Sequence, residues 1–194
     1  TGERFTLTLK EVTLPTPEHD AVVEAVFPLQ GKALPRDHAQ ALRHALAEHF
    51  PWLHSDVGAG IHPLKLVSGP ESLALLSPRT RLILRVNASR LDALKALAGV
   101  QLDVTGHALR LGDVHLRALQ PLATLYAYRV AASTADEPVF MQAIEAELAA
   151  LAIAGERVCG KRQSLRVDGV DMTTFSMMLH ALVPEQSLRL QQYG

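Results

Sequence analysis

The stretch AVVEAVFPLQGKALPRDHAQALRHALAEHF, residues 21–50, decides the fold class. Residues 21–31 form an apolar run that is rich in β-branched side chains and ends at glycine, which is typical of a strand. In residues 35–50, apolar side chains recur every three or four positions, which predicts a helix with one buried stripe. Pro35 suits the first position of this helix, and Pro51 ends it. A strand that leads into an amphipathic helix is therefore the first unit.

The rest of the sequence predicts antiparallel strands and then a second copy of the same order. We expect strands over 60–68, 79–86, 124–132, 163–168 and 172–182, helices over 90–97, 137–153 and 184–192, and two short strands within 101–119. This order indicates an α+β protein of two tandem ferredoxin-like βαββαβ halves, the second lacking its last strand. We assign residues 1–120 to the first half and 121–194 to the second. RNA-recognition modules use such a four-stranded sheet, although the fold alone does not establish function.

Composition bounds the class of protein. The 194 residues are 48% hydrophobic and 20% charged, which is typical of a folded domain. No apolar run approaches the ~18 residues of a membrane span. The one cysteine, Cys159, cannot pair within the chain and favours a reducing, cytoplasmic location. The net charge of −1 argues mildly against nucleic-acid binding, although a local basic patch can be hidden in the net charge.

Histidines are numerous and raise the question of a metal site. His38, His44, His49 and His54 are separated by six, five and five positions. Ligands on one helical face recur at three or four positions, and neither cysteines nor clustered carboxylates complete a coordination shell. We therefore expect neither a metal site nor, since no phosphate-binding glycine motif is present, a nucleotide cofactor.

His38 is the strongest single candidate for catalysis. In the predicted helix it lies in the first turn, where free backbone N–H groups and the positive end of the helix dipole favour a phosphate. The same field disfavours imidazolium, so the ring is able to accept a proton. From the residues alone two interpretations stay open: a general base beside a phosphate, or a polar residue at a helix start without a role.

Basic residues gather in the second half. Such clusters are either solvated faces or, together with basic residues of the first half, one side of an RNA groove. Lysine and arginine close to Cys159 could favour its thiolate, although an inert cysteine is the simpler interpretation. The candidates for RNA binding are Arg36, Lys161, Arg162, Arg166 and Arg189.

Residues 29–64, LQGKALPRDHAQALRHALAEHFPWLHSDVGAGIHPL, carry a specific resemblance. This stretch resembles the CRISPR repeat-cleaving endoribonuclease family, in its Myxan-subtype branch. The motifs that carry the resemblance occur in the order L-Q-G, L-P-x-D-H, A-L, P-W-L-H and G-I-H-P. Residues 77–84 (SPRTRLIL), 97–111 and 164–190 resemble later segments of that branch in the same order. The resemblance spans about residues 22–194.

This resemblance implies two tandem ferredoxin-like halves and a CRISPR repeat RNA as partner. It implies metal-independent cleavage of the precursor RNA within each repeat, in which the 2′-hydroxyl attacks the adjacent phosphate. The products are a 2′,3′-cyclic phosphate and a 5′-hydroxyl. The histidine of the family's D-H block, which is His38 here, is the implied general base.

Two features depart from the family's pattern. The branch often has a tyrosine shortly after the histidine, where this chain has Gln40, so Tyr126 or Tyr128 would have to replace it. The family also has a glycine-rich basic loop and a closing strand after the last helix, where this sequence ends at Gly194. The alternatives are therefore a non-cleaving, repeat-binding subunit of a CRISPR interference complex and an unrelated ferredoxin-like interaction module.

Overall fold

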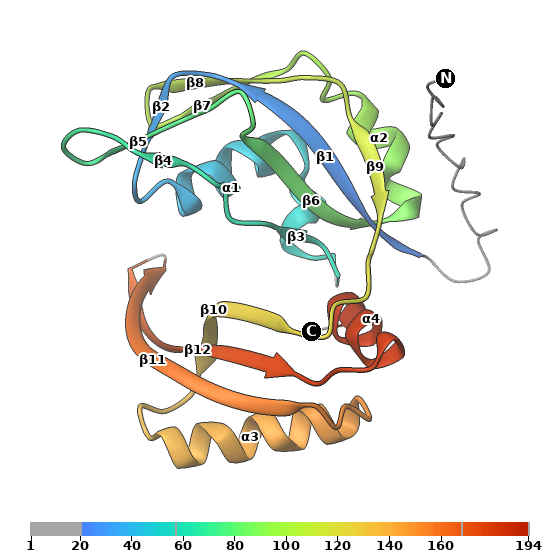
Figure 1. Ribbon diagram of the computed structural model, residues 1–194. Coiled ribbons are helices and arrows are strands. Elements are labelled where there is room, and N and C mark those ends of the chain that lie inside the picture. The colour runs from blue at the N-terminus through green and yellow to red at the C-terminus, as the bar shows by residue number, and fades with distance from the viewer. Residues whose placement is uncertain (1–20, 57, 168, 194) are drawn as a thin grey trace, which may run out of the picture.

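The computed structural model describes residues 21–56, 58–167 and 169–193 (Figure 1). Strand β1 (Val22–Gln30) is central in the first sheet and pairs antiparallel with β6 (Arg81–Asn87) along one edge. Along its other edge β1 pairs with β9 (His115–Ala118) and, further along, with β8 (His107–Leu111). β3 (Gly60–Ile61) extends the sheet beyond β6, and β7 (Gln101–Val104) pairs with β8. The order β3-β6-β1-β9 is that of a ferredoxin-like sheet.

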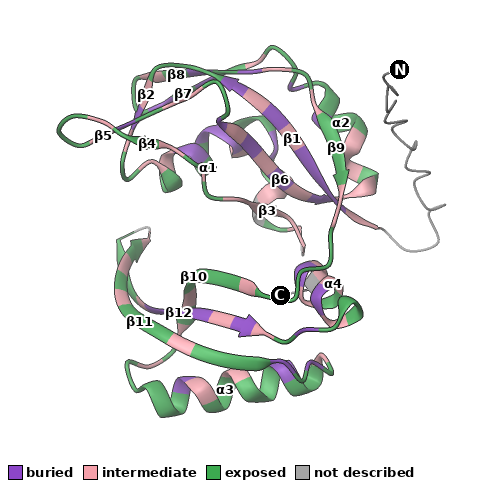
Figure 2. Cartoon of the chain, viewed as in Figure 1, coloured by how far each residue is buried: buried purple, intermediate pink, exposed green. Residues whose placement is uncertain are grey.

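Burial alternates along β1, which explains why the helices cover one face of this sheet. Val23, Ala25, Phe27 and Leu29 are buried in the main core. They pack with Leu42, Ala45 and Leu46 of α1 (Ala39–His49) and with Leu94 of α2 (Leu91–Lys95). Figure 2 shows this buried stripe along β1 and β6.

Helix α1 begins four residues later than its sequence pattern predicts. Pro35 ends β2 (Ala33–Pro35), which pairs with β5 (Leu73–Leu75), and the backbone N–H of Arg36 donates to Ser72 O at 2.8 Å. The proline therefore marks the end of a strand and not the start of a helix. His38 is the N-cap of α1, with φ −89° and ψ −11°.

A small second sheet, β2-β5-β4, was not predicted. The strand expected over 60–68 is split, because Ile61 pairs with β6 whereas β4 (Val67–Ser68) pairs with β5. Pro63, which cannot donate to a strand ladder, lies between the two pieces. Two short 3₁₀ segments, Pro51–His54 and Ala88–Arg90, follow α1 and β6.

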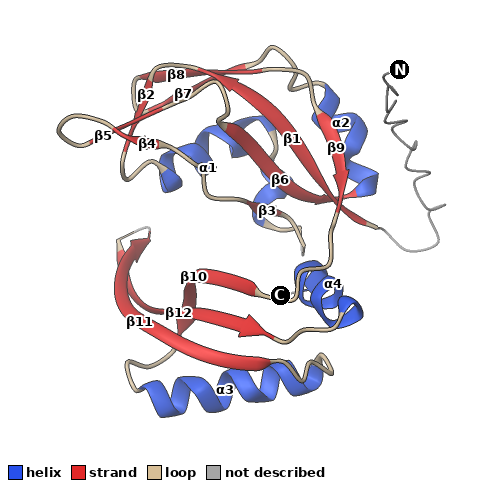
Figure 3. Ribbon diagram, in the orientation of Figure 1, coloured by secondary structure: helices blue, strands red, loops and turns tan. Residues whose placement is uncertain are grey.

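The second half repeats the order. β10 (Leu125–Ala132), β11 (Glu156–Val167) and β12 (Val170–His180) form a sheet with β12 in the middle. α3 (Glu137–Ala150) covers one face, and α4 (Pro184–Tyr193) follows β12. Figure 3 shows α3 on the face of this sheet that is turned away from the first sheet. The order β11-β12-β10 matches β3-β6-β1, so both halves are ferredoxin-like and the α+β class is confirmed.

Two features fix α3 in place. The Asp136 carboxylate accepts a hydrogen bond from Val139 N at 3.1 Å, which caps the helix as its sequence predicts. The rings of Phe140 and Phe175 stack with centroids 4.5 Å apart, joining α3 to the centre of β12. Among the described helices, none has the length and apolar character that crossing a membrane requires.

Candidate functional site

The side chain of His38 is held by its own backbone turn. Its Nδ1 lies 2.8 Å from the carbonyl oxygen of Pro35, and the ring is half-buried. A carbonyl oxygen only accepts, so in neutral His38 the proton resides on Nδ1 and donates to Pro35. The Nε2 lone pair is then directed away from this bond. His38 is thus fixed in the tautomer that can accept a proton at Nε2.

Arg36 lies two positions before His38 and is tied to the small sheet. Its guanidinium donates through Nε to Leu73 O at 3.3 Å and through Nη2 to Gly69 O at 3.2 Å. The residue is exposed, and these two bonds use only part of the five N–H donors of the guanidinium. The structure therefore places a cation near the start of α1, in the same turn as His38.

The structure does not gather the basic candidates of the second half into one patch. Lys161 is exposed on β11, and its backbone N–H donates to Ser176 Oγ at 2.8 Å. Arg162 instead donates to Ala135 O, at the start of α3, at 3.0 Å. Arg162 and Arg166 alternate with Gln163 and Leu165, so they share the face of the sheet that carries α3.

The last two of these arginines have local partners. Arg166 Nε lies 3.9 Å from Asp171 Oδ1 across the β11–β12 hairpin. Arg189 of α4 donates to Leu151 O, at the end of α3, at 2.8 Å. Only Lys161 of the four basic candidates is therefore placed by strand register on the face opposite α3.

A buried carboxylate that sequence reasoning missed lies between the two halves. Glu24 of β1 is 7% exposed and faces away from α1, opposite Arg85 on β6 and Arg117 on β9. Arg117 donates to Glu24 Oε2 through Nε at 2.7 Å and Nη2 at 2.6 Å, and His62 Nε2 lies 3.2 Å from Oε1. We call Glu24, His62, Arg85 and Arg117 the junction cluster. Its only sequence signal is one acidic residue inside an apolar strand.

Arg85 connects this cluster to the second half. Its Nη2 lies 3.9 Å from Glu24 Oε1, and its Nη1 donates to Gln191 O near the end of α4 at 2.7 Å. The carbonyl end of a helix carries partial negative charge, so the guanidinium is stabilised from both sides. Gln191 in turn donates to Gln120 O, in the segment that joins the halves, at 2.9 Å.

The junction cluster predicts a pH dependence of stability. Burial, and then the Arg85 guanidinium, lower the pKa of His62 below its ordinary value of 6.5, while Glu24 acts in the opposite direction. The unfolded chain therefore binds this proton more tightly, so stability is full above pH 6.5 and decreases as the pH falls below it. We expect the melting temperature to fall more between pH 7.5 and 5.5 in the wild type than in His62→Gln. Equal falls in both proteins, measured by circular dichroism, would contradict this role.

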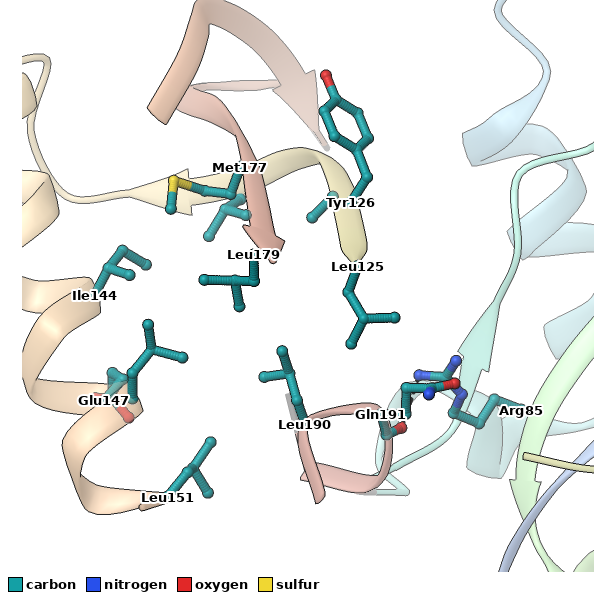
Figure 4. Close-up of a pocket in the computed structure, with 13 residues that line it drawn as sticks. Arg85, Leu125, Tyr126, Ile144, Glu147, Leu151, Met177, Leu179, Leu190 and Gln191 are labelled. Atoms are coloured by element: carbon teal, nitrogen blue, oxygen red, sulfur yellow. Dashed lines mark hydrogen bonds between the residues drawn. The ribbon is translucent and has the colours of Figure 1, made fainter. Parts of the chain in front are cut away.

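A cavity of about 480 Å³ opens between β10, β12, α3 and α4 (Figure 4). Leu125, Ile144, Leu179 and Leu190 point into it, and Arg85 and Gln191 lie at one end. The lining is almost entirely apolar and holds no histidine, cysteine or hydroxyl nucleophile apart from the edge residue Tyr126. All of its lining residues except Arg85 belong to the second half, and His38 is not among them.

Other candidate chemistry is not supported. Burial, and then the nearby carboxylate of Glu137, raise the pKa of Cys159, so its surroundings oppose the thiolate that Lys161 and Arg162 could have favoured. Within the described ranges, no three histidine, cysteine, aspartate or glutamate side chains gather as a metal site would require.

Comparison with known proteins agrees with this architecture. Residues 23–194 match the family model described as Cas6 Crispr. The chain is 35% identical over 173 residues to the CRISPR-associated endonuclease Cas6 of Myxococcus xanthus (strain DK1622), covering 89% of this chain and 75% of that protein.

Two solved structures share the fold at low identity. A Cas6-related protein from Pyrococcus furiosus has a TM-score of 0.56 at 9% identity and covers 90% of this chain and 93% of its own. A RAMP protein described as binding different RNA substrates has a TM-score of 0.52 at 10% identity, with 85% and 89% covered. The family model spans both ferredoxin-like halves and the His38 turn, so this chain belongs to the Cas6 family.

Proposed function

We propose that this protein is an endoribonuclease that cleaves precursor CRISPR RNA within its repeats. The match to a CRISPR-associated endonuclease supports the substrate and the reaction class. The 2′-hydroxyl of the RNA attacks the adjacent phosphate, and the products are a 2′,3′-cyclic phosphate and a 5′-hydroxyl. Because the nucleophile belongs to the RNA, the protein has to supply only a base, a proton donor and stabilisation of the phosphorane, and no metal ion is required.

His38 is the general base in this proposal. The observation that carries it is the 2.8 Å bond from its Nδ1 to Pro35 O, which leaves Nε2 unprotonated and the ring fixed in orientation. The first backbone N–H groups of α1 follow directly, and a helix N-terminus binds phosphate. The base and the phosphate site are therefore adjacent in the chain, and Arg36 supplies positive charge beside them.

The remaining assignments extend this proposal. Residues 1–120 carry the catalytic turn, and residues 121–194 position the RNA, with contributions from Lys161, Arg162, Arg166 and Arg189. Charge-assisted bonds of Arg162 and Arg189 to backbone carbonyls leave further donors on each guanidinium for phosphate. We propose that the enzyme acts in the cytoplasm, where its single cysteine stays reduced.

The proposal is tested with a repeat RNA that carries one 2′-deoxynucleotide at the mapped scissile position. Removing that hydroxyl removes the nucleophile but almost none of the binding surface. We expect no cleavage of this RNA and a Kd within about 3-fold of the all-ribose repeat, since a single hydrogen bond contributes modestly. Continued cleavage at the same position would exclude attack by the 2′-hydroxyl.

A second function is favoured by one feature, the glutamine at position 40, where the branch often has a tyrosine. A chain that lacks part of the catalytic set could serve as a repeat-binding subunit of a CRISPR interference complex. Such a subunit would bind the repeat with a steep salt dependence and release no product from the all-ribose RNA.

A further inference from the structure

We propose that the face of the second sheet opposite α3 binds unpaired nucleotides of the RNA, with Tyr126 and Tyr128 stacking on bases. This inference rests on the proposed function and identifies where the RNA is read outside the His38 turn. We call this surface the tyrosine face. It consists of the side chains of β10, β11 and β12 that strand register places away from α3.

Register defines the tyrosine face. On β12, Phe175, Met177 and Leu179 are buried in the clusters that contain Phe140 and Leu148 of α3. The alternate residues Thr174, Ser176 and Met178 therefore lie on the opposite face. Figure 1 shows that this face is the one turned toward the first sheet.

Two aromatic rings lie on this face without being buried by the first half. Tyr126, which pairs with Met178, is 52% exposed, and Tyr128 is 68% exposed. Their rings contact each other edge to face, with centroids 4.6 Å apart. Figure 4 shows Leu125 pointing into the apolar cavity and Tyr126 pointing away from it. Large aromatic side chains exposed side by side on a sheet are a stacking surface for bases.

Two β-bulges place the tyrosine rings and a lysine close to the same position of β12. β10 has a bulge between Ala127 and Val130, and β11 has one between Cys159 and Arg162. Both bulges lie against the same stretch of β12, at Ser176, whose buried hydroxyl accepts the backbone N–H of Lys161 at 2.8 Å. Bulges redirect side chains next to functional sites. Tyr128 and Lys161 thus flank Ser176 from opposite strands.

A close approach of two strands fixes the second bulge. A Cβ atom at Gly160 would clash with Ser176 Oγ, so glycine is required where β11 passes this hydroxyl. Gly160 therefore keeps Lys161 in register with Ser176, across β12 from the tyrosines.

Charge on this face favours an anionic ligand. Lys161 is exposed, and Arg129 in the β10 bulge is exposed as well. Among the described strand residues that register places here, the one carboxylate is Glu156, at the end of the sheet, where it lies 3.4 Å from His180 Nε2. Asp171 lies on the opposite face with Arg166. Two aromatic rings beside one or two cations can bind a base by stacking and its phosphate by charge. The base has to be unpaired, because a base inside a duplex is already stacked between its neighbours.

The test compares leucine with phenylalanine at both tyrosines. With the uncleavable 2′-deoxy repeat, we expect Tyr126→Leu/Tyr128→Leu to raise the Kd by about 5- to 150-fold, the range for one stacked base. Tyr126→Phe/Tyr128→Phe keeps the rings and should stay within about 3-fold of the wild type. Val139→Ala, at an exposed position of α3, is the control on the far side of the sheet.

Crosslinking locates the contact independently of affinity. A repeat that carries 5-iodouridine at its unpaired positions is irradiated with the wild-type protein, and the adducts are mapped by mass spectrometry. We expect adducts on Tyr126 or Tyr128. The folding of the leucine variant is checked by circular dichroism melts. We expect a melting temperature close to that of the wild type, because both tyrosine side chains are exposed.

The outcomes separate this inference from the proposed function. A wild-type protein that neither binds nor cleaves the repeat would refute both. If the wild-type protein cleaves the repeat but the leucine variant has an unchanged Kd and no tyrosine adducts form, RNA binding by the tyrosine face is refuted and the proposed function is not. That surface would then be a candidate for binding a protein. Loss of affinity in the leucine variant but not in the phenylalanine variant supports it.

Discussion

Replacing His38 by alanine is expected to lower the single-turnover rate constant of repeat cleavage by about 10²- to 10⁴-fold, the contribution of a general base. In the proposed mechanism the imidazole accepts the proton of the 2′-hydroxyl, and its Nδ1 bond to Pro35 O selects the tautomer with an unprotonated Nε2. Binding should change little, because the ring of His38 contributes at most one hydrogen bond to the RNA. The measurement uses excess protein and labelled repeat RNA.

His49→Ala provides the matched control. His49 is exposed in the last turn of the same helix, so it tests the loss of a histidine from α1 without removing the base. We expect its rate constant to stay within about 3-fold of the wild type, because about 16 Å separates eleven residues along a helix. A His38→Ala protein that is folded, binds the repeat and cleaves it at the wild-type rate would refute the catalytic assignment.

Replacing Glu24 by alanine is expected to destabilise the protein by about 2–4 kcal/mol, because the variant leaves the largely buried Arg85 guanidinium without its carboxylate, whereas Arg117 and His62 are partly exposed. Glu24 is almost fully buried and is shared by two guanidinium groups and the His62 ring. Arg85 would retain its bond to Gln191 O and its 3.5 Å contact with His62 Nε2. For a protein of this size, the melting temperature should fall by roughly 10 °C.

Glu24→Gln and Asp92→Ala separate charge from geometry in this experiment. Glutamine keeps an acceptor for Arg117 but loses the charge, so an intermediate loss of melting temperature is expected. Asp92 pairs with Lys95 at 2.8 Å on the exposed surface of α2, and loss of that pair should change the melting temperature little. A Glu24→Ala protein that melts at the wild-type temperature would show that the junction cluster does not hold the fold together.

The sequence predicts those parts of the fold that follow from local pattern. The strand over 21–31, the helix over 137–153 and the Asp136 cap were all expected, and the structure has β1, α3 and that cap within a few residues of the predicted bounds. These elements have strong periodicity, and their turns contain the residues that helix starts and strand ends require. The repeated order of strands and helices was sufficient to indicate the ferredoxin-like halves.

The parts that were missed depend on contacts between distant segments. Proline at position 35 is compatible both with the start of a helix and with the end of a strand. Only the pairing of Pro35 with Leu73 decides between the two. In the same way, Glu24 is an ordinary strand residue until β6 and β9 place Arg85 and Arg117 beside it. No local pattern encodes either contact, since the partners lie 38 to 93 positions away along the chain.

The candidate site shows the same division. Sequence and resemblance both point to His38, and its position at the start of α1 follows from the local turn. The basic residues of β11 look like one cluster in the sequence, but alternation along a strand sends Lys161 to one face and Arg162 to the other. From the sequence, the tyrosines of β10 are expected only as substitutes for the missing phenol, because their exposure on the same face as Lys161 depends on how the three strands pair.

We propose that this protein cleaves repeat RNA by proton transfer through His38 and needs no metal ion. The most direct measurement is incubation of the wild-type protein with its cognate repeat RNA in excess EDTA, followed by mass analysis of the 5′ fragment. We predict cleavage at one position and a fragment that ends in a 2′,3′-cyclic phosphate. Absence of cleavage in EDTA with activity restored by a divalent metal, or a fragment ending in a 3′-hydroxyl, would contradict the account.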